Sequence, residues 1–422
     1  MTYPEAAQNR ERQIYRRADK QVDPSSSSVP LHISIGVMAH NEAGRIASTL
    51  RSLLSQDLLR AKNSSDPAFP TAQVELRILA NGCTDRTAQI AQQILTETTQ
   101  TEHFSRLRWS VDVIEQPGKA NAWNLFVHQL SHPEANYLFL VDADIELLGY
   151  HTLQSMVATL TQHPEACAAV DRPIKDIVLK TTSKTLPEKL SAALSHLSGK
   201  QFEKAAASEE NTRASPTWLC GQLYCGRAAT LRQLHLPISS LAEDGLLYQL
   251  LVTDGLRSPA NPYRVILAPS AAHAFEAYTQ LGLLLKHERW LIASNSANDL
   301  LLDRLYLRGL AGTEASQYIH RCNQENPFWF HELVAAEAQH RRWLIPRLIL
   351  TRRFVSLSQK SLVKAILMLP VAIAAFLVDV WLAYLANRDL HRGIALKYWG
   401  KPGTVPASAE PNSQTLELTK TI

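Results

Sequence analysis

Two aspartates, Asp142 and Asp144, follow directly on a short apolar run, and their spacing suggests chemistry. The run, at 137–141, combines aromatic, branched and β-favouring residues, which predicts a strand buried on both faces, as in a parallel sheet. Ligands of open α/β sheets collect at the carboxyl ends of the strands, and residues two apart in extended chain point to the same side. Mg²⁺ and Mn²⁺ prefer such oxygen ligands, usually one or two carboxylates with substrate phosphates. The pair therefore predicts a divalent-cation site; the alternative is a turn that caps a helix at 150–161.

Three earlier strand–turn–helix steps are expected to bring polar loops to the same edge of the sheet. Strands are predicted at 31–38, 74–79 and 109–114, each followed by a polar turn and a helix. The loops offer amide and carboxylate groups for a base and ribose, and a lysine for phosphate. Asn41 could instead be a simple helix cap. The steps predict a nucleotide site beside the cation, with contributions from Ala39, His40, Asn41, Glu42, Asn81, Gly82, Asp85, Lys119, Asn124 and Asp142.

The bulk composition is that of a globular protein without a nucleic-acid partner. The 422 residues are 45% hydrophobic and 19% charged, and the net charge of +4 is small for this length. Five scattered cysteines fit neither a disulfide framework nor a zinc spacing, which predicts reduced thiols in a cytosolic setting. The first residues are polar and charged, so no secretory signal peptide is expected.

Four motifs in order resemble the family 2 glycosyltransferases of the GT-A fold. They are Ala-His-Asn-Glu at 39–42, Asn-Gly-Cys-Thr-Asp-Arg-Thr at 81–87, Gly-Lys-Ala-Asn-Ala-Trp-Asn at 118–124 and Val-Asp-Ala-Asp at 141–144. The resemblance spans residues 31 to about 295. It implies an α/β, Rossmann-like, mostly parallel sheet with flanking helices, and a nucleotide-sugar donor bound at 39–42 and 81–85, with Asp144 nearest the metal and diphosphate. The chain departs from the family at Asn81, where many members carry an aspartate.

An acidic pair, Glu243 and Asp244, precedes a helix predicted at 246–252. By resemblance this is the family's acidic dyad, in which the aspartate is the catalytic base. Inverting transfer needs one carboxylate within hydrogen-bond reach of the acceptor hydroxyl. Acidic residues are also common at helix starts for dipole reasons alone. Upstream, the apolar stretch 218–227 resembles the family's acceptor-side strand, where Gly221 could let the donor sugar approach.

Two further positions carry open alternatives. Residues 286–290 are similar to the Gln/Arg-x-x-Arg-Trp element of lipid and polysaccharide glycosyltransferases, with Lys286 in the first position. The similarity implies that Arg289 binds the diphosphate and that Trp290 forms the floor of the acceptor site. The alternative is that these residues belong to a basic amphipathic helix without a role in binding. His273 is either a third metal ligand or a packed side chain.

The composition changes after residue 335. Residues 340–357 mix arginines with aromatic and aliphatic residues, which suits an anionic membrane surface, and 362–386 are nearly all apolar. One transmembrane or deeply interfacial helix is expected, rather than a buried soluble helix. Basic residues flank the segment on both sides, which leaves its topology open. The predicted organisation is a disordered tail at 1–29, a catalytic domain at 30–335, membrane-associated helices at 336–401 and a disordered tail at 402–422.

Together these features predict an inverting, Mg²⁺- or Mn²⁺-dependent transfer of a sugar from a nucleotide donor to an acceptor hydroxyl. A lipid or lipid-linked acceptor at the cytosolic membrane face is expected, with variability in the span 172–216 that covers the acceptor side. The alternatives are a sugar-nucleotide-handling nucleotidyltransferase and a catalytically inactive, membrane-anchored binding protein of the same fold.

Overall fold

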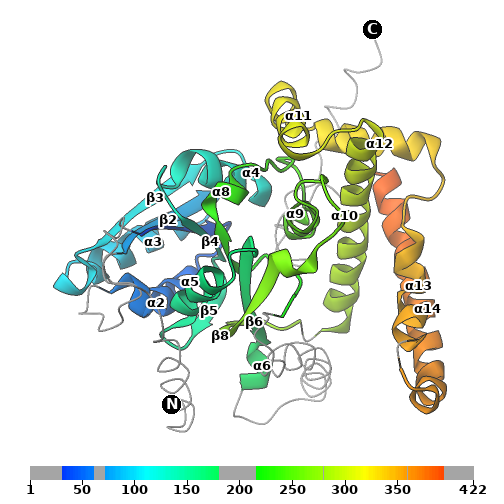
Figure 1. Ribbon diagram of the computed structural model, residues 1–422, viewed down its shortest axis with the longest axis horizontal. Coiled ribbons are helices and arrows are strands. Elements are labelled where there is room, and N and C mark those ends of the chain that lie inside the picture. The colour runs from blue at the N-terminus through cyan, green and yellow to red at the C-terminus, as the bar shows by residue number, and fades with distance from the viewer. Residues whose placement is uncertain (1–30, 61–71, 180–214, 279, 359, 394–422) are drawn as a thin grey trace.

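The computed structural model describes residues 31–60, 72–179, 215–278, 280–358 and 360–393. The predicted tails at 1–29 and 402–422 and most of the span 172–216 lie outside these residues. Within them, eight strands form one sheet in the order β3-β2-β1-β4-β7-β6-β8-β5 (Figure 1).

One half of the sheet is parallel and closely follows the sequence prediction. Strands β3, β2, β1 and β4 pair in parallel, because a helix between successive strands returns the chain to the starting edge. Val37 pairs with both Ile78 and Val141, so the three strands end almost level. The strand bounds are β1 His32–Ala39, β2 Gln73–Asn81, β3 Leu107–Ile114 and β4 Tyr137–Asp142.

The other half of the sheet is mixed. Strand β7 runs antiparallel to both β4 and β6, β6 pairs in parallel with β8, and β5 lies antiparallel to β8 at the edge. The sequence did not predict β5 or β6, and β7 is shorter than the stretch 218–227 that resembles the family's acceptor-side strand. The bounds are β5 Ile145–Leu148, β6 Ala168–Lys175, β7 Leu223–Arg227 and β8 Val265–Phe275.

Two apolar cores, one on each face of the sheet, hold it between helices. Alternate residues of β1, beginning with Ile33, Ile35 and Val37, pack with α2, α3 and α5, as the period of two in a strand requires. On the other face Gly36 leaves room for the Phe126 ring, which would lie 2.9 Å from a Cβ at that position. The first set of helices comprises α2 Ile46–Leu54, α3 Thr87–Thr98 and α5 Thr152–Gln162.

The second face carries the shorter helices near the loops and the long C-terminal helices (Figure 1). The shorter helices are α4 Lys119–Leu125, α8 Ala228–Leu231 and α9 Glu243–Val252. Helix α6 Asp176–Leu179 follows β6 and lies apart from them, where Ile177 packs against Ala277. A π-helical turn at Phe126–Leu130 continues α4, and one-turn 3₁₀ segments lie at Asp57–Leu59, Glu102–Phe104 and Pro262–Arg264. The C-terminal helices are α10 Leu281–Leu307, α11 Gly312–Glu325, α12 Trp329–His340, α13 Arg347–Ser358 and α14 Leu362–His391.

The last two helices form an antiparallel hairpin beside α10 (Figure 1). Helix α14 is long and apolar enough to cross a membrane, and only 11% of its most apolar window is buried. The core helix of a soluble protein would be mostly buried, so the expectation of a buried soluble helix does not describe α14.

Candidate functional site

Lys119 is the centre of the candidate site. It begins α4, just after β3, and its Nζ lies 2.7 Å from Oδ1 of Asp142 at the end of β4. The same Nζ lies 3.0 Å from Oε1 of Glu243 at the start of α9 and donates to the Gly221 carbonyl at 3.1 Å. Four segments that are far apart in the sequence therefore meet at one ammonium group, on the edge of the sheet that the sequence predicts.

The charges at Lys119 are strongly coupled. Burial opposes the ionised form of Lys119, but Asp142 and Glu243 outweigh it and hold the pKa of the lysine well above 10.5. Burial raises the pKa of Asp142; Lys119 opposes this rise and Asp144 adds to it. The two aspartates are thus close enough for one to disfavour ionisation of the other, which a cation between them would relieve.

The chemistry of this aspartate pair fits a divalent cation. Asp142 is the last residue of β4, and Asp144 lies in the turn that leads to β5. Within the described residues, no group of three or more His, Cys, Asp or Glu side chains is arranged to hold a metal ion. Mg²⁺ sites commonly take one or two carboxylates from the protein and the other ligands from water and substrate phosphates. Asp142 and Asp144 would hold such an ion.

The acidic dyad starts α9 itself, rather than preceding the helix. Burial raises the pKa of Glu243 to about 7, with Lys119 opposing the rise and Asp244 adding to it. Asp244 accepts hydrogen bonds from the backbone N–H groups of Gly221 at 3.3 Å and of Gly245 at 2.8 Å. A Cβ on Gly221 would lie only 2.9 Å from the Cβ of Asp244, so the close approach of the two segments requires glycine. Asp244 is fixed by these bonds and remains partly exposed.

The loops after β1 and β2 are bound to each other through Asn41. Its backbone is left-handed, with φ of 54°, and its side-chain oxygen accepts from the Thr84 N–H at 2.8 Å and the Asp85 N–H at 3.3 Å. Asn41 is therefore not a helix cap; α2 begins only at Ile46. Asp85 in turn accepts from the Ala43 N–H at 3.0 Å. The two predicted donor loops form a single rigid unit.

Asp85 is stabilised as a carboxylate within this unit. Burial opposes its ionisation, but hydrogen bonds from Thr87 and Ala43 lower its pKa overall. His40 joins the same unit, since its Nδ1 lies 2.7 Å from the Asn81 carbonyl oxygen. The backbone N–H of Glu42 donates to Thr87 at 2.8 Å. The roles of Ala39, His40, Asn41, Glu42 and Asp85 in donor binding stay predictions.

Two predicted donor contacts instead hold loops together. Asn81 is fully buried, and its amide donates to the Gly118 carbonyl at 2.7 Å. Asn124 donates to the Leu236 carbonyl at 2.8 Å and accepts from the Leu236 N–H at 3.0 Å, so both halves of its amide are used. These contacts hold neighbouring loops together, and the expected contact of the two side chains with the donor stays a prediction. Gly82, with φ of 59°, packs its α-carbon against Pro117 and joins the same loop layer.

His273 is a buried core residue and not a metal ligand. It lies in β8 with no exposed side-chain surface; its Nδ1 is 2.7 Å from Oδ2 of Asp171, and its Nε2 is 3.2 Å from Oε1 of Gln222. Both ring nitrogens are therefore engaged, which corrects the expectation of a third metal ligand. The pairing maintains the junction of β6 and β8, since Asp171 belongs to β6.

Arg289, which the sequence predicts to contact the diphosphate, forms an ion pair with another helix in the structure. Arg289 on α10 forms an ion pair with Asp389 of α14, 100 residues later in the chain. Trp290 is half-buried and packs against the core below α10. Arg289 and Trp290 thus take part in the joint between α10 and its neighbours, and their expected contacts with diphosphate and acceptor stay predictions.

His287 is a residue of the site that the sequence did not single out. Burial lowers its pKa, while Glu288 and Asp244 both act to raise it, so the ring lies within electrostatic reach of Asp244. Its ring stacks on Trp290 with centroids 5.7 Å apart, and the Tyr278 ring is 4.9 Å away. No sequence pattern marks His287 as a site residue, because the approach of α10 to the start of α9 is a tertiary contact.

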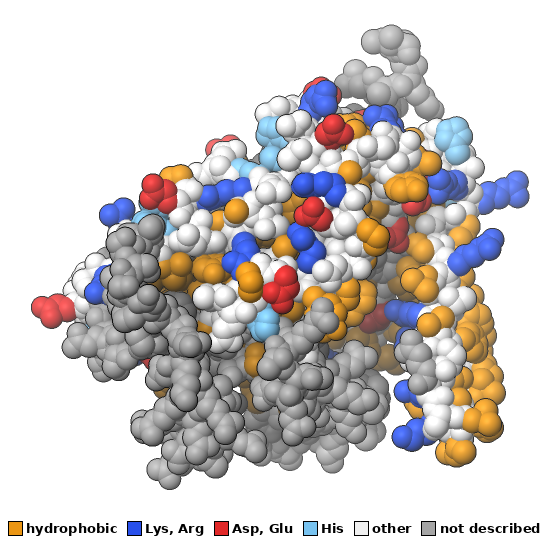
Figure 2. Space-filling view, viewed as in Figure 1, with side chains coloured by type: hydrophobic (Ala, Val, Ile, Leu, Met, Phe, Trp, Pro, Cys, Tyr) orange, Lys and Arg blue, Asp and Glu red, His pale blue; other side chains and the backbone are white. Residues whose placement is uncertain are grey.

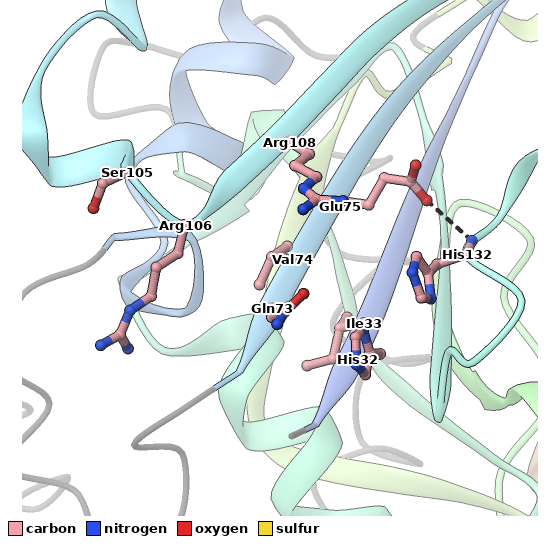
Figure 3. Close-up of a pocket in the computed structure, with 9 residues that line it drawn as sticks. All are labelled: His32, Ile33, Gln73, Val74, Glu75, Ser105, Arg106, Arg108 and His132. Carbon is pink, nitrogen blue, oxygen red and sulfur yellow. Dashed lines mark hydrogen bonds between the residues drawn. The ribbon is translucent and has the colours of Figure 1, made fainter. Parts of the chain in front are cut away.

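A cavity of about 350 Å³ lies at the opposite end of the parallel strands (Figure 3). Its lining includes His32 and Gln73, which begin β1 and β2, and Glu75, which accepts from the His132 N–H at 3.0 Å. Parallel α/β sheets bind ligands at the carboxyl ends of the strands. The cavity takes no part in the site around Lys119.

Comparisons with known proteins agree with this geometry in part. Residues 34–217, somewhat less than half of the chain, match the sequence model of the family described as Glycosyl transferase family 2. The matched segment contains β1 to β6 and the loops that carry Asn41, Asn81, Lys119 and Asp142. No curated protein matches the sequence.

Several solved structures are similar at low identity. The mannosyltransferase PcManGT from Pyrobaculum calidifontis, in complex with GDP-Man and Mn²⁺, is 15% identical, with a TM-score of 0.47 over 92% of this chain and 95% of that chain. S. aureus TarS 1-349 is 15% identical, with a TM-score of 0.39 over 86% and 92%. Glucosyl-3-phosphoglycerate synthase from Mycobacterium tuberculosis, with Mn²⁺, UDP-glucose and phosphoglyceric acid, is 18% identical, with a TM-score of 0.36 over 64% and 79%. At TM-scores below 0.5 these likenesses add no weight.

The assignment comes from the family match and from the fold that carries it. Helices cover both faces of a mixed eight-stranded sheet, and the loops after β1 to β4 meet at its carboxyl edge. This is the α/β architecture that the four sequence motifs imply. Residues 34–217 are therefore similar to Glycosyl transferase family 2, in the part of the chain that carries the loops after β1 to β4.

Proposed function

We propose that the chain transfers a sugar from a nucleotide-sugar donor to an acceptor hydroxyl with inversion at the anomeric carbon, in a reaction that requires Mg²⁺ or Mn²⁺. The observation that carries the proposal is the convergence of Asp142, Lys119, Gly221 and the dyad Glu243–Asp244 at one edge of the sheet. A nucleotide binds across this edge in folds of this class.

Asp244 is the proposed catalytic base. Its carboxylate is oriented by the N–H groups of Gly221 and Gly245 and remains partly exposed. The acceptor hydroxyl gives its proton to Asp244 as the hydroxyl oxygen forms a bond to the anomeric carbon. At the same time the bond from that carbon to the diphosphate oxygen breaks. The diphosphate leaves from the opposite face of the sugar, and this in-line displacement inverts the configuration.

The residues around Asp244 are placed to stabilise the charge on the leaving diphosphate. Lys119 positions the Asp142 carboxylate and brings positive charge to the place where diphosphate charge develops. Asp142 and Asp144 would hold a divalent ion, which would supply Lewis-acid neutralisation of that charge. Glu243 holds Lys119 from the other side and is a positioning residue.

The acceptor is proposed to be a lipid or a lipid-linked molecule, met at the cytosolic membrane face. The support is α14, a long apolar helix with 11% of its most apolar window buried, together with the five cysteines, all of which are free thiols. The hairpin joins the catalytic domain through α10, the helix that also carries His287 towards Asp244.

Hydrolysis of a panel of nucleotide sugars in detergent tests the proposal. A transferase leaks some donor to water, so slow release of nucleoside diphosphate is expected with Mn²⁺ or Mg²⁺, stopped by a chelator and restored by added metal. Release that is indifferent to the chelator would contradict the metal assignment. A nucleotidyltransferase would release pyrophosphate from a nucleoside triphosphate instead, and an inactive binding protein would leave every donor intact.

A further inference from the structure

The hairpin of α13 and α14 has both of its ends fixed to the catalytic domain. At the α14 end, Asn387 accepts from the Leu344 N–H at 2.8 Å and donates to the Arg342 carbonyl at 3.1 Å. Asp389 is ion-paired with Arg289 of α10. Residue 342 precedes α13 and residue 387 is near the end of α14, so the chain leaves the domain and returns to it at one place.

This geometry disfavours a membrane span by α14. The last third of the helix is packed on the domain, where Leu382, Ala383, Ala386 and Leu390 are each at most 3% exposed. Only residues 362–378 are free of that packing, which is about 25 Å of helix and less than the ~30 Å hydrocarbon core. A span would have to pull Leu390 and the Arg289–Asp389 pair away from the domain.

The most exposed apolar side chains of α14 form one broad apolar stripe along its length. Successive members are one, three, four or six residues apart, which keeps them within one side of an α-helix. They are between 51% and 76% exposed: Leu362, Val363, Ile366, Leu367, Val371, Leu377, Trp381 and Tyr384. The buried residues of the last third lie on the opposite side, so the stripe faces away from the domain (Figure 2).

The charges of α14 also favour a helix that lies in the plane of the membrane surface. Lys364 at one end and Arg388 at the other are exposed, so each can reach a lipid headgroup. Asp379, the acidic residue in the middle, is only 2% exposed and accepts four hydrogen bonds from Arg352 and Arg353 of α13, at 2.7 to 3.1 Å. The stripe contains no charge, and Trp381 and Tyr384 are residue types enriched at membrane interfaces.

We infer that the α13–α14 hairpin is a monotopic anchor that lies in the headgroup and acyl boundary of one leaflet, apolar stripe downward, without crossing the bilayer. This rests on the membrane association in the proposed function and adds its geometry. The catalytic domain then rests on the same leaflet from which a lipid acceptor would be taken. The partner is a bilayer containing anionic lipid, which the basic ends of the hairpin select.

Flotation with preformed vesicles of phosphatidylcholine and phosphatidylglycerol tests the stripe. Leu367→Glu in the free part and Trp381→Glu in the docked part should each lower the bound fraction about tenfold or more, which is ~1.4 kcal/mol of binding free energy. The matched control is Leu307→Glu, since Leu307 on α10 is 78% exposed but outside the hairpin. An upright hairpin would be affected by Leu367→Glu alone, and that result would overturn the in-plane arrangement.

The second readout is the side on which the C-terminus lies. With an epitope tag after Ile422 and protein added from outside, a protease should remove the tag without detergent. Protection of the tag until detergent is added would show a span and overturn the inference. Donor hydrolysis in detergent is measured on each variant. Intact hydrolysis with lost flotation in a stripe variant supports the anchor. Absent hydrolysis with intact flotation of the unaltered chain overturns the proposed transfer and leaves the anchor in place.

Discussion

At the loop edge of the sheet one lysine forms ion pairs with two carboxylates, whereas in the C-terminal hairpin two arginines form ion pairs with one carboxylate. Lys119 is shared by Asp142 and Glu243, with Asp144 and Asp244 adding negative charge nearby. Asp379 is paired with both Arg352 and Arg353, and Arg352 also lies 3.9 Å from Glu288. A bound cation stabilises a cluster that has an excess of negative charge. It does not stabilise a cluster in which positive charge is already sufficient. The comparison separates a site that is proposed to bind ligand from a joint that holds helices.

The largest effect is expected at the proposed base. Asp244→Asn keeps the hydrogen-bond acceptor for Gly221 but removes the proton acceptor, and a positioned base typically contributes about 10²–10⁴-fold. Turnover should fall by at least that order while donor affinity is retained. Steady-state rates and donor titration measure the two separately. Normal turnover in this variant would remove Asp244 from the mechanism.

Removing the shared lysine should come next in size. Lys119→Met leaves Asp142 and Glu243 buried beside each other without a cation, and breaking a buried pair costs up to about 3–5 kcal/mol. Denaturant unfolding measures the loss, and Mn²⁺ should recover more stability in this variant than in the unaltered chain. A fully stable Lys119→Met protein would show that the cluster is already balanced.

The pH dependence of stability should be the third effect. The pKa of Glu243 is raised from 4.5 to about 7, so the folded protein keeps a proton that the unfolded chain has lost. The stability from that proton is fully present below pH 4.5 and is lost as the pH rises to 7. Glu243→Gln should remove this fall, which is roughly 1–3 kcal/mol, from unfolding free energies measured between pH 4.5 and 8. The same slope in both proteins would contradict the assignment.

The smallest effect is expected in the hairpin. Asp379→Leu frees Arg352 and Arg353, but these side chains are 37% and 43% exposed and can turn to water. The cost should be about 1 kcal/mol or less, and it should not respond to Mn²⁺. Thermal unfolding of this variant and of Lys119→Met, each with and without Mn²⁺, compares the two regions directly. A Mn²⁺ response in the hairpin variant alone would reverse the comparison.

The parallel half of the fold was predictable because it is local. Strands β1 to β4 were expected within two residues of their observed bounds, since short apolar runs ended at polar turns. Strand β6 was missed because Ala168–Lys175 contains a proline and charged residues, and its place in the sheet is set by β7 and β8. Strand β5 follows Asp144 with no turn signal between them.

Residue roles were predictable only where the partner was foreseeable. Asp142 and Lys119 end and begin predicted elements at one edge, so their meeting follows from topology. The engagement of His273 with Asp171, of Arg289 with Asp389 and of Asn124 with Leu236 joins residues about 100 positions apart. No spacing in the sequence encodes these contacts, because they arise when separate elements pack together.

The account depends on the aspartate pair taking up a cation together with a diphosphate. Calorimetric titration of Mn²⁺ in the presence of UDP or GDP measures this on the unaltered chain, on Asp144→Asn and on the hairpin control Asp379→Asn. The account predicts that the unaltered chain and the control bind Mn²⁺ alike and that Asp144→Asn loses about tenfold or more in affinity, ~1.4 kcal/mol. Equal binding by all three proteins, or binding by none, would contradict it.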